Sequence, residues 1–264
     1  MLKILFPTDF SKNSLSVLPW AADFCKAIKA ELVLFNAMLA PVLQTDGPVV
    51  NAEEIIEEQA DFIKDKLAKI AVNIRTKHNV IVNIRTEYGF PTETIASLAK
   101  NDNFDLIILS AKGDTNILDS IFGNVTENLF EKAEIPVLSV PTNLEFKNIN
   151  KVAFASSNID YDAVQIFDLL EMLKPCNTKI KLVHIVKGND FENETFEDFP
   201  NLEYIELSGE DKLKTFSDYI HQENIDLICV KRYKLPFLYR WTHKSFSEDL
   251  LQHIKKPLLV FKDE

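Results

Sequence analysis

Residues 105–113 have the sequence Asp105-Leu106-Ile107-Ile108-Leu109-Ser110-Ala111-Lys112-Gly113. The short apolar run predicts a buried strand, and the small residues after it predict a turn at the carboxyl end of that strand. Similar runs alternate along the chain with amphipathic segments of helix length, which is typical of a parallel sheet covered by helices. We therefore expect an α/β fold.

The first half of the chain is expected to form one doubly wound unit. Its strands are predicted at residues 3–6, 31–37, 80–86, 105–109 and 136–140. Its helices are predicted after a cap at Ser11 or Asn13, and at residues 53–75, 92–100 and 124–132. Each crossover then places a helix on one face of the sheet.

The same order of elements returns after residue 148. Strands are predicted at residues 151–155, 180–185, 202–207, 226–230 and 257–261, and helices at residues 160–173, 211–222 and 246–254. Residues 126–138 align without gaps to residues 247–259, and residues 104–107 align to residues 225–228. The sequence thus predicts two tandem doubly wound domains, residues 1–144 and 145–264, each with a parallel five-stranded sheet. The second lacks the long helix of the first and has an acidic loop at residues 188–200 instead.

Composition excludes several classes of function. The chain has 264 residues and a formal net charge of −11, which disfavours nucleic acid or anionic lipid as the main partner. No apolar stretch reaches the length of a membrane span, and the first strand begins too early for a signal peptide. Three widely spaced cysteines give no disulfide or zinc pattern, so we expect a cytoplasmic protein.

The segment after the strand at residues 105–109 has the features of a phosphate-binding loop. It contains Gly113 and Gly123 and ends where the helix at residues 124–132 begins. Backbone N–H groups and the helix dipole at such a point attract phosphate, and glycines allow its close approach. The side chains of Lys112, Asn124 and Thr126 could add donors. The spacing matches neither the P-loop nor the Rossmann fingerprint.

This spacing resembles the G-x2-G-x9-G-[ST] nucleotide loop of the universal stress protein family. The opening stretch Leu5-Phe6-Pro7-Thr8-Asp9 and the helix entry Gly89-Phe90-Pro91 are also similar to that family. The resemblance implies adenine nucleotide α-hydrolase-like or flavodoxin-like domains that pair through their last strands, residues 137–140 and 258–261, about a pseudo-two-fold axis. It is also compatible with a homodimer. Two positions depart from the motif, because Ser110 replaces its first glycine and Asn124 its final serine or threonine.

The resemblance implies a site for ATP or another adenine nucleotide, with Mg²⁺ as a companion of the phosphates. Asp9 would accept a hydrogen bond from the base or the ribose. The positions carried over from the family are Pro7, Thr8, Asp9, Ala37, Ser110, Ala111, Lys112, Gly113, Gly123, Asn124, Val125 and Thr126. From the residues alone, Asp9 could equally be an ordinary helix N-cap, and Gly123 a tight turn.

The second half departs from the motif at every aligned position. Lys231, Lys234 and Lys244 align with Ser110, Gly113 and Gly123, and Ser157 aligns with Asp9. Residues 231–244 combine five lysines or arginines with four aromatic residues and no acid. This loop could bind an acidic protein partner, or it could be an ordinary solvated surface loop.

Two functions follow. The first is a regulatory stress-response protein that binds an adenine nucleotide in the first domain only, with slow hydrolysis at most, since no catalytic motif is present. The second is a nucleotide-independent scaffold that uses the loop at residues 231–244.

Overall fold

The computed structural model describes residues 1–39, 52–111, 124–155, 159–186, 193–195, 199–231 and 255–262. The first half follows the predicted order, with boundaries shifted by a few residues at most. Its elements are β1 (Lys3–Pro7), α1 (Lys12–Ala27), β2 (Glu31–Met38), α2 (Ala52–His78), β3 (Val82–Tyr88), α3 (Pro91–Asn101), β4 (Leu106–Ser110), α4 (Asn124–Lys132) and β5 (Val137–Val140).

Among the described residues, the second half repeats this order without a counterpart of α2 and adds two elements that the sequence did not predict, the 3-10 helix η1 and the strand β8. Its elements are β6 (Lys151–Ala155), α5 (Ile159–Leu173), the 3-10 helix η1 (Lys174–Cys176), β7 (Lys179–Val186), β8 (Asn193–Thr195), β9 (Leu202–Ser208), α6 (Lys212–Gln222), β10 (Leu227–Lys231) and β11 (Leu258–Phe261). Strand β8 lies within the expected acidic loop and pairs antiparallel with β9, which it covers at the sheet edge. The helix expected at residues 246–254 lies outside the described residues.

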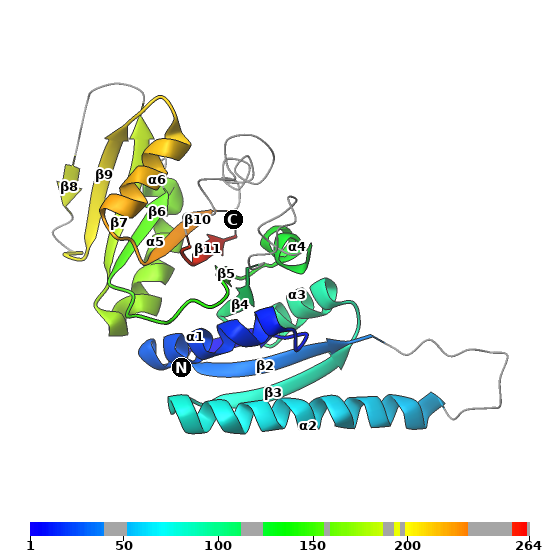
Figure 1. Ribbon diagram of the computed structural model, residues 1–264. Coiled ribbons are helices and arrows are strands. Elements are labelled where there is room, and N and C mark those ends of the chain that lie inside the picture. The colour runs from blue at the N-terminus through cyan, green and yellow to red at the C-terminus, as the bar shows by residue number, and fades with distance from the viewer. Residues whose placement is uncertain are drawn as a thin grey trace.

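All strands belong to one 11-stranded sheet in the order β3-β2-β1-β4-β5-β11-β10-β6-β7-β9-β8 (Figure 1). Strands β5 and β11 join the halves, with Leu138 antiparallel and opposite Leu259. The prediction that the last strands of the two halves meet is therefore confirmed. The other pairs are parallel except β8 with β9.

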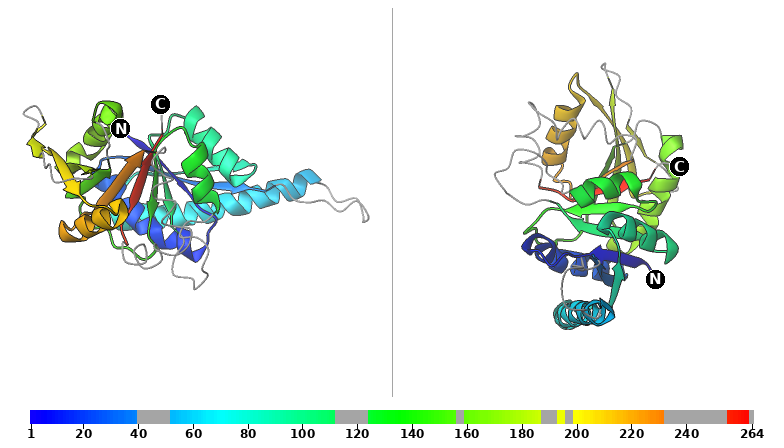
Figure 2. Two further views of the ribbon diagram at one scale, coloured as in Figure 1. Left: turned by 90° about the horizontal axis from the view of Figure 1, so that it is seen from above. Right: turned by 90° about the vertical axis from the view of Figure 1, so that its right-hand side faces the viewer.

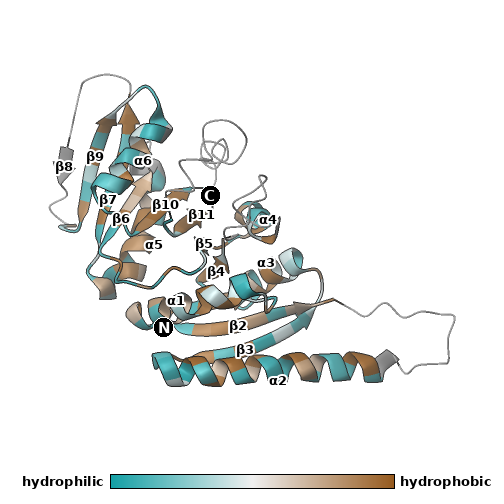
Figure 3. Ribbon diagram, in the orientation of Figure 1, coloured by the Kyte–Doolittle hydropathy of each residue, from teal (hydrophilic) through white to brown (hydrophobic). Residues whose placement is uncertain are grey.

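Helices cover both faces of the sheet (Figure 2). Because side chains alternate between the two faces along a strand, one strand contributes apolar residues to both hydrophobic clusters. On one face Ile4 and Phe6 of β1 pack with residues of α1, α2 and α5. On the other face Leu5 packs in a second cluster with residues of α3, α4 and α6. The inner strands β4, β5, β10 and β11 are consequently mostly hydrophobic in Figure 3, as expected for strands buried on both sides.

Local contacts show that the halves are built alike. The backbone N–H of Lys3 donates to Asp105, and that of Lys151 donates to Asp226 in the same way. Helices α1 and α5 are each followed by a residue of positive φ, Lys29 at 57° and Asn177 at 52°. Lys3 with Lys151 and Lys29 with Asn177 have the same offset in sequence as Asp9 with Ser157, so the two halves also align without gaps from β1 to β2 and from β6 to β7.

The turn that leads into α3 requires glycine at position 89. Gly89 has a φ of +152°, and a Cβ there would lie 2.3 Å from the hydroxyl oxygen of Thr94. Only glycine adopts this backbone at no steric cost. Pro91 then begins the helix, where its missing N–H leaves no bond unmade.

Candidate functional site

The candidate site lies at the carboxyl ends of β1 and β4, where the strand order of the first half reverses. Helix α1 leaves β1 toward one face and α4 lies on the other, so the connections diverge at this switch point, which we call the first crevice after the place where open α/β folds bind ligands. Open α/β sheets bind their ligands at such points. The described candidate residues come from the elements at this edge: Pro7, Thr8 and Asp9 at the end of β1, Ala37 in β2, Ser110 and Ala111 at the end of β4, and Val125 and Thr126 in the first turn of α4.

Thr8 holds the loop between β1 and α1 in place. Its hydroxyl lies 2.7 Å from the Ser14 hydroxyl and accepts from the backbone N–H of Phe10 at 3.0 Å. Its carbonyl accepts from the side-chain amide of Asn36 at 2.7 Å. Thr8, Ser14 and Asn36 are all buried, so these bonds are shielded from water and fix the loop that carries Asp9.

Asp9 is exposed at the crevice. Its Oδ1 accepts from the backbone N–H of Ser11 at 2.9 Å. The N-cap of α1 is Ser11, whose hydroxyl accepts from the N–H of Ser14. The alternative that Asp9 is the helix N-cap is therefore wrong, and Asp9 is a carboxylate held just before the helix.

The pKa of Asp9 lies below its ordinary value of 3.8. Partial burial raises it, but hydrogen bonds from Ser11 and Ser14 to the carboxylate together lower it by more. Asp9 is consequently an anion at neutral pH and can accept hydrogen bonds from hydroxyl or amino groups of a ligand.

A pH titration tests this assignment. A carboxylate with a depressed folded pKa stabilises the fold above its unfolded pKa, and this contribution disappears as the pH falls through the folded pKa. The difference in melting temperature between wild type and Asp9→Asn should therefore be full at neutral pH and shrink below about pH 4. A difference that stays constant down to about pH 2 would contradict the depressed pKa.

Phe10 follows Asp9 in a left-handed backbone conformation, with a φ of 61°. Few residues other than glycine, asparagine and aspartate adopt this region, and such outliers concentrate at functional sites. The ammonium of Lys66 on α2 lies 4.0 Å from the centre of the Phe10 ring, so α2 helps to hold the strained residue.

The phosphate side of the site is described in part. The hydroxyl of Thr126 donates to the carbonyl of Ser110 at 3.5 Å and ties the first turn of α4 to the end of β4. Ala111 is fixed by its N–H bond to the carbonyl of Val140 at 2.8 Å. Lys112, Gly113, Gly123 and the side chain of Asn124 lie outside the described residues.

The corresponding point of the second half holds an ion pair. Lys231 ends β10, which lies beside β6, and its Nζ is 3.6 Å from Oδ1 of Asp162 on α5. Both side chains are buried, with 6% and 0% of their surface exposed. In the alignment Lys231 and Asp162 take the places of Ser110 and Ser14, so two charged groups replace two small hydroxyls under the helix.

The sequence analysis missed Asn36, Ser14 and Asp162. The signal for Asn36 was its place as a polar residue within the apolar run of β2, directly before Ala37. The signal for Asp162 was a carboxylate aligned with the buried Ser14. Neither signal predicts the hydrogen-bond or ion-pair partner of the residue, because each partner lies on a different element.

The described residues were also compared with two further kinds of site. Among them, no group of three histidine, cysteine, aspartate or glutamate side chains could hold a metal ion. Within that same part of the chain, no helix is long and apolar enough to cross a membrane.

Comparison with known proteins shows which family this chain belongs to. The Universal stress protein family matches residues 1–141. Universal stress protein MJ0577 of Methanocaldococcus jannaschii is 29% identical over 158 residues, which cover 52% of this chain and 93% of the relative. The crystal structure of a universal stress protein from Archaeoglobus fulgidus covers 99% of this chain and 98% of its own, with a TM-score of 0.72 and 16% identity. A universal stress protein solved in complex with cAMP matches 53% of this chain and 97% of its own at 21% identity, with a TM-score of 0.37. The chain belongs to the universal stress protein family.

Proposed function

We propose that this universal stress protein binds one adenine nucleotide per chain, in the domain formed by residues 1–144, and acts as a regulatory protein rather than a dedicated enzyme. The observation that carries the proposal is the difference between this switch point and the aligned point of the second half, the second crevice. Small side chains and the exposed carboxylate of Asp9 lie at the first, whereas the buried ion pair of Lys231 and Asp162 lies at the second. The domain of residues 145–264 would then bind no nucleotide.

The groups at the first crevice suit the two ends of a nucleotide. The Asp9 carboxylate can accept from ribose hydroxyls or the adenine amino group. At the other end, the N–H groups in the first turn of α4, which have no partner within the helix, suit phosphate, with Thr126 held against Ser110. The nucleotide would supply the polyanion, and a Mg²⁺ ion would come with its phosphates. Ser14 and Asn36 would position the loop that carries Asp9, and Thr8 would line the adenosine side as the family resemblance implies.

Equilibrium dialysis with labelled ATP tests the stoichiometry. We expect saturable binding of one nucleotide per chain. Gly123→Lys should abolish it, because a long side chain would occupy the space that the phosphates need. The matched control is Lys244→Gly at the aligned position of the second half, which should leave one site per chain.

Thermal denaturation gives an independent measurement. A ligand at a hundredfold excess over its dissociation constant stabilises the protein by about 2.7 kcal/mol. ATP, cAMP and GTP should be compared, and the adenine nucleotides should give the larger shift. Two sites per chain, no saturable binding, or equal binding after Gly123→Lys would each disprove the proposal.

The scaffold alternative gains no support from its described residue. Lys231, the first cation of the loop at residues 231–244, is buried and faces Asp162 instead of solvent. Residues 232–244 lie outside the described part of the chain, so binding of a protein partner there stays a prediction.

A further inference from the structure

Helix α2 covers a specific face of the first half. It is amphipathic, as the alternating colours in Figure 3 show, and it buries Leu67, Ala71 and Ile74. It packs against α1 and β3. Leu15 and Pro19 of α1 lie at this contact, opposite Ile70 and Ile74 of α2.

The counterpart face of the second half is not covered by a helix within the described residues. The described part of the connection from β7 to β9 contains the short strand β8. Helix α5, which corresponds to α1, carries Ala163, Phe167 and Leu170 at spacings of one and two helical turns, so they form one stripe. Phe167 is 55% exposed.

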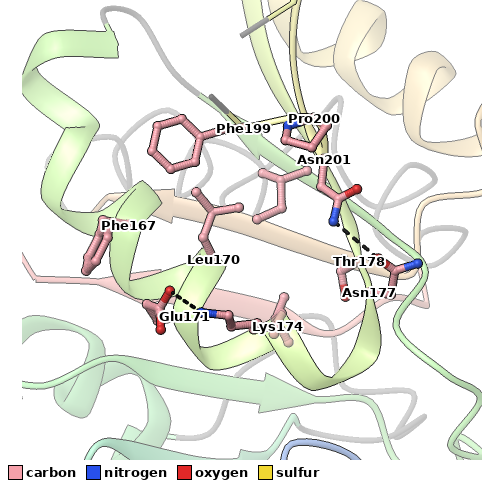
Figure 4. Close-up of a pocket in the computed structure, with 11 residues that line it drawn as sticks. Phe167, Leu170, Glu171, Lys174, Asn177, Thr178, Phe199, Pro200 and Asn201 are labelled. Atoms are coloured by element: carbon pink, nitrogen blue, oxygen red, sulfur yellow. Dashed lines mark hydrogen bonds and ion pairs between the residues drawn. The ribbon is translucent and has the colours of Figure 1, made fainter. Parts of the chain in front are cut away.

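Phe167 and Leu170 of this stripe lie on one wall of a groove of about 330 Å³ (Figure 4). Phe167 and Leu170 come from α5, and Phe199 and Pro200 come from the segment that leads into β9. Phe199 is 44% exposed. Large apolar side chains thus face water on two opposite walls, which is typical of a surface that binds a partner.

Charged groups at the groove indicate which charge a bound helix would carry and at which of its ends. In the first half, the carboxylate of Asp23 on α1 lies 2.7 Å from Nδ1 of His78, the last residue of α2. In the alignment Glu171 takes the place of Asp23, and it also lines the groove. Its side chain is about half exposed, and its one described ion pair is with the exposed Lys174 at the start of η1. An incoming helix with a basic C-terminal residue could therefore reach it.

We propose that this groove binds an amphipathic helix of a partner protein, in the position that α2 takes in the first half. The partner helix has apolar residues at the spacing of Leu67, Ala71 and Ile74 and a basic side chain in its last turn. Helix-in-groove recognition uses this kind of apolar stripe. The proposal is independent of nucleotide binding.

A peptide with the sequence of residues 52–78, carrying a fluorescent label, is the probe because it has this chemistry. We expect saturable binding to the full chain, measured by fluorescence anisotropy. Phe167→Glu in the protein should weaken binding about tenfold or more, equivalent to about 1.4 kcal/mol. Phe199→Glu on the opposite wall should have the same effect. A peptide with Leu67→Glu should not bind, because its apolar face is interrupted.

The matched control is Phe62→Glu in the protein, at a phenylalanine that is 67% exposed on α2. This variant makes the same chemical change away from the groove and should bind the peptide normally. Circular dichroism should show that all three protein variants are folded. Absence of saturable binding, or equal binding to the wild-type and Phe167→Glu proteins, would overturn the proposal. Self-association of the peptide-free chain that Phe167→Glu abolishes would also overturn it, because the groove would then be an interface between two copies.

Discussion

Replacement of Lys231 by methionine is expected to lower the free energy of unfolding by about 3–5 kcal/mol. The substitution removes the ammonium that lies 3.6 Å from the carboxylate of Asp162, whose side chain is 0% exposed. A buried charge that loses its ion-pair partner is costly because protein solvates it much less than water does. Urea denaturation, followed by circular dichroism, measures the loss.

The control is the double variant Lys231→Met with Asp162→Leu. Replacing both members of a buried pair by apolar groups of similar size is often neutral or stabilising. The double variant should therefore recover most of the stability that the single variant loses. If the single and double variants are equally unstable, the loss comes from packing, and our assignment of the ion pair is wrong.

Leu138→Ala is expected to destabilise the whole chain by about 2–5 kcal/mol. Leu138 is fully buried in β5 and lies opposite Leu259 of β11, where the two halves join. The smaller side chain leaves a cavity and removes apolar contact at the seam. Because one hydrophobic cluster contains residues of both halves, we expect a single unfolding transition with a lower midpoint.

Phe62→Ala serves as the comparison, since this exposed side chain should contribute within about 0.5 kcal/mol. Denaturation of both variants should be followed by far-UV circular dichroism and tryptophan fluorescence together. If Leu138→Ala costs less than about 1 kcal/mol, the seam contributes little and the halves are largely independent.

The thermal experiment with ATP, cAMP and GTP uses the stability of the whole chain as a measure of nucleotide binding. Binding stabilises only the folded state, so a ligand of the first crevice should raise the single midpoint of the whole chain. The Lys231→Met variant should respond to nucleotide as the wild type does, because its defect lies in the second half.

The sequence by itself determined the order, type and approximate bounds of most elements. Hydrophobic period is a local property, since two residues on the same face of a strand or helix are only a few positions apart. The prediction for α4 gave its bounds, residues 124–132, and the prediction for β6 gave residues 151–155. The resemblance to the universal stress protein family also allowed the joining of β5 and β11 to be predicted, because members of that family pair through their last strands.

Only the tertiary structure decided which polar groups meet. The pairs Thr8 with Asn36 and Asp162 with Lys231 lie on separate elements, so their contact depends on strand order and register. The same holds for β8, which is too short for a hydrophobic period and is defined by its bonds to β9. The glycine-containing motif predicted the candidate site of the first half. The buried ion pair of Lys231 and Asp162 distinguishes the second half from the first. Contact between two such residues depends on how their elements pack in space, and the order of residues along the chain does not give this packing.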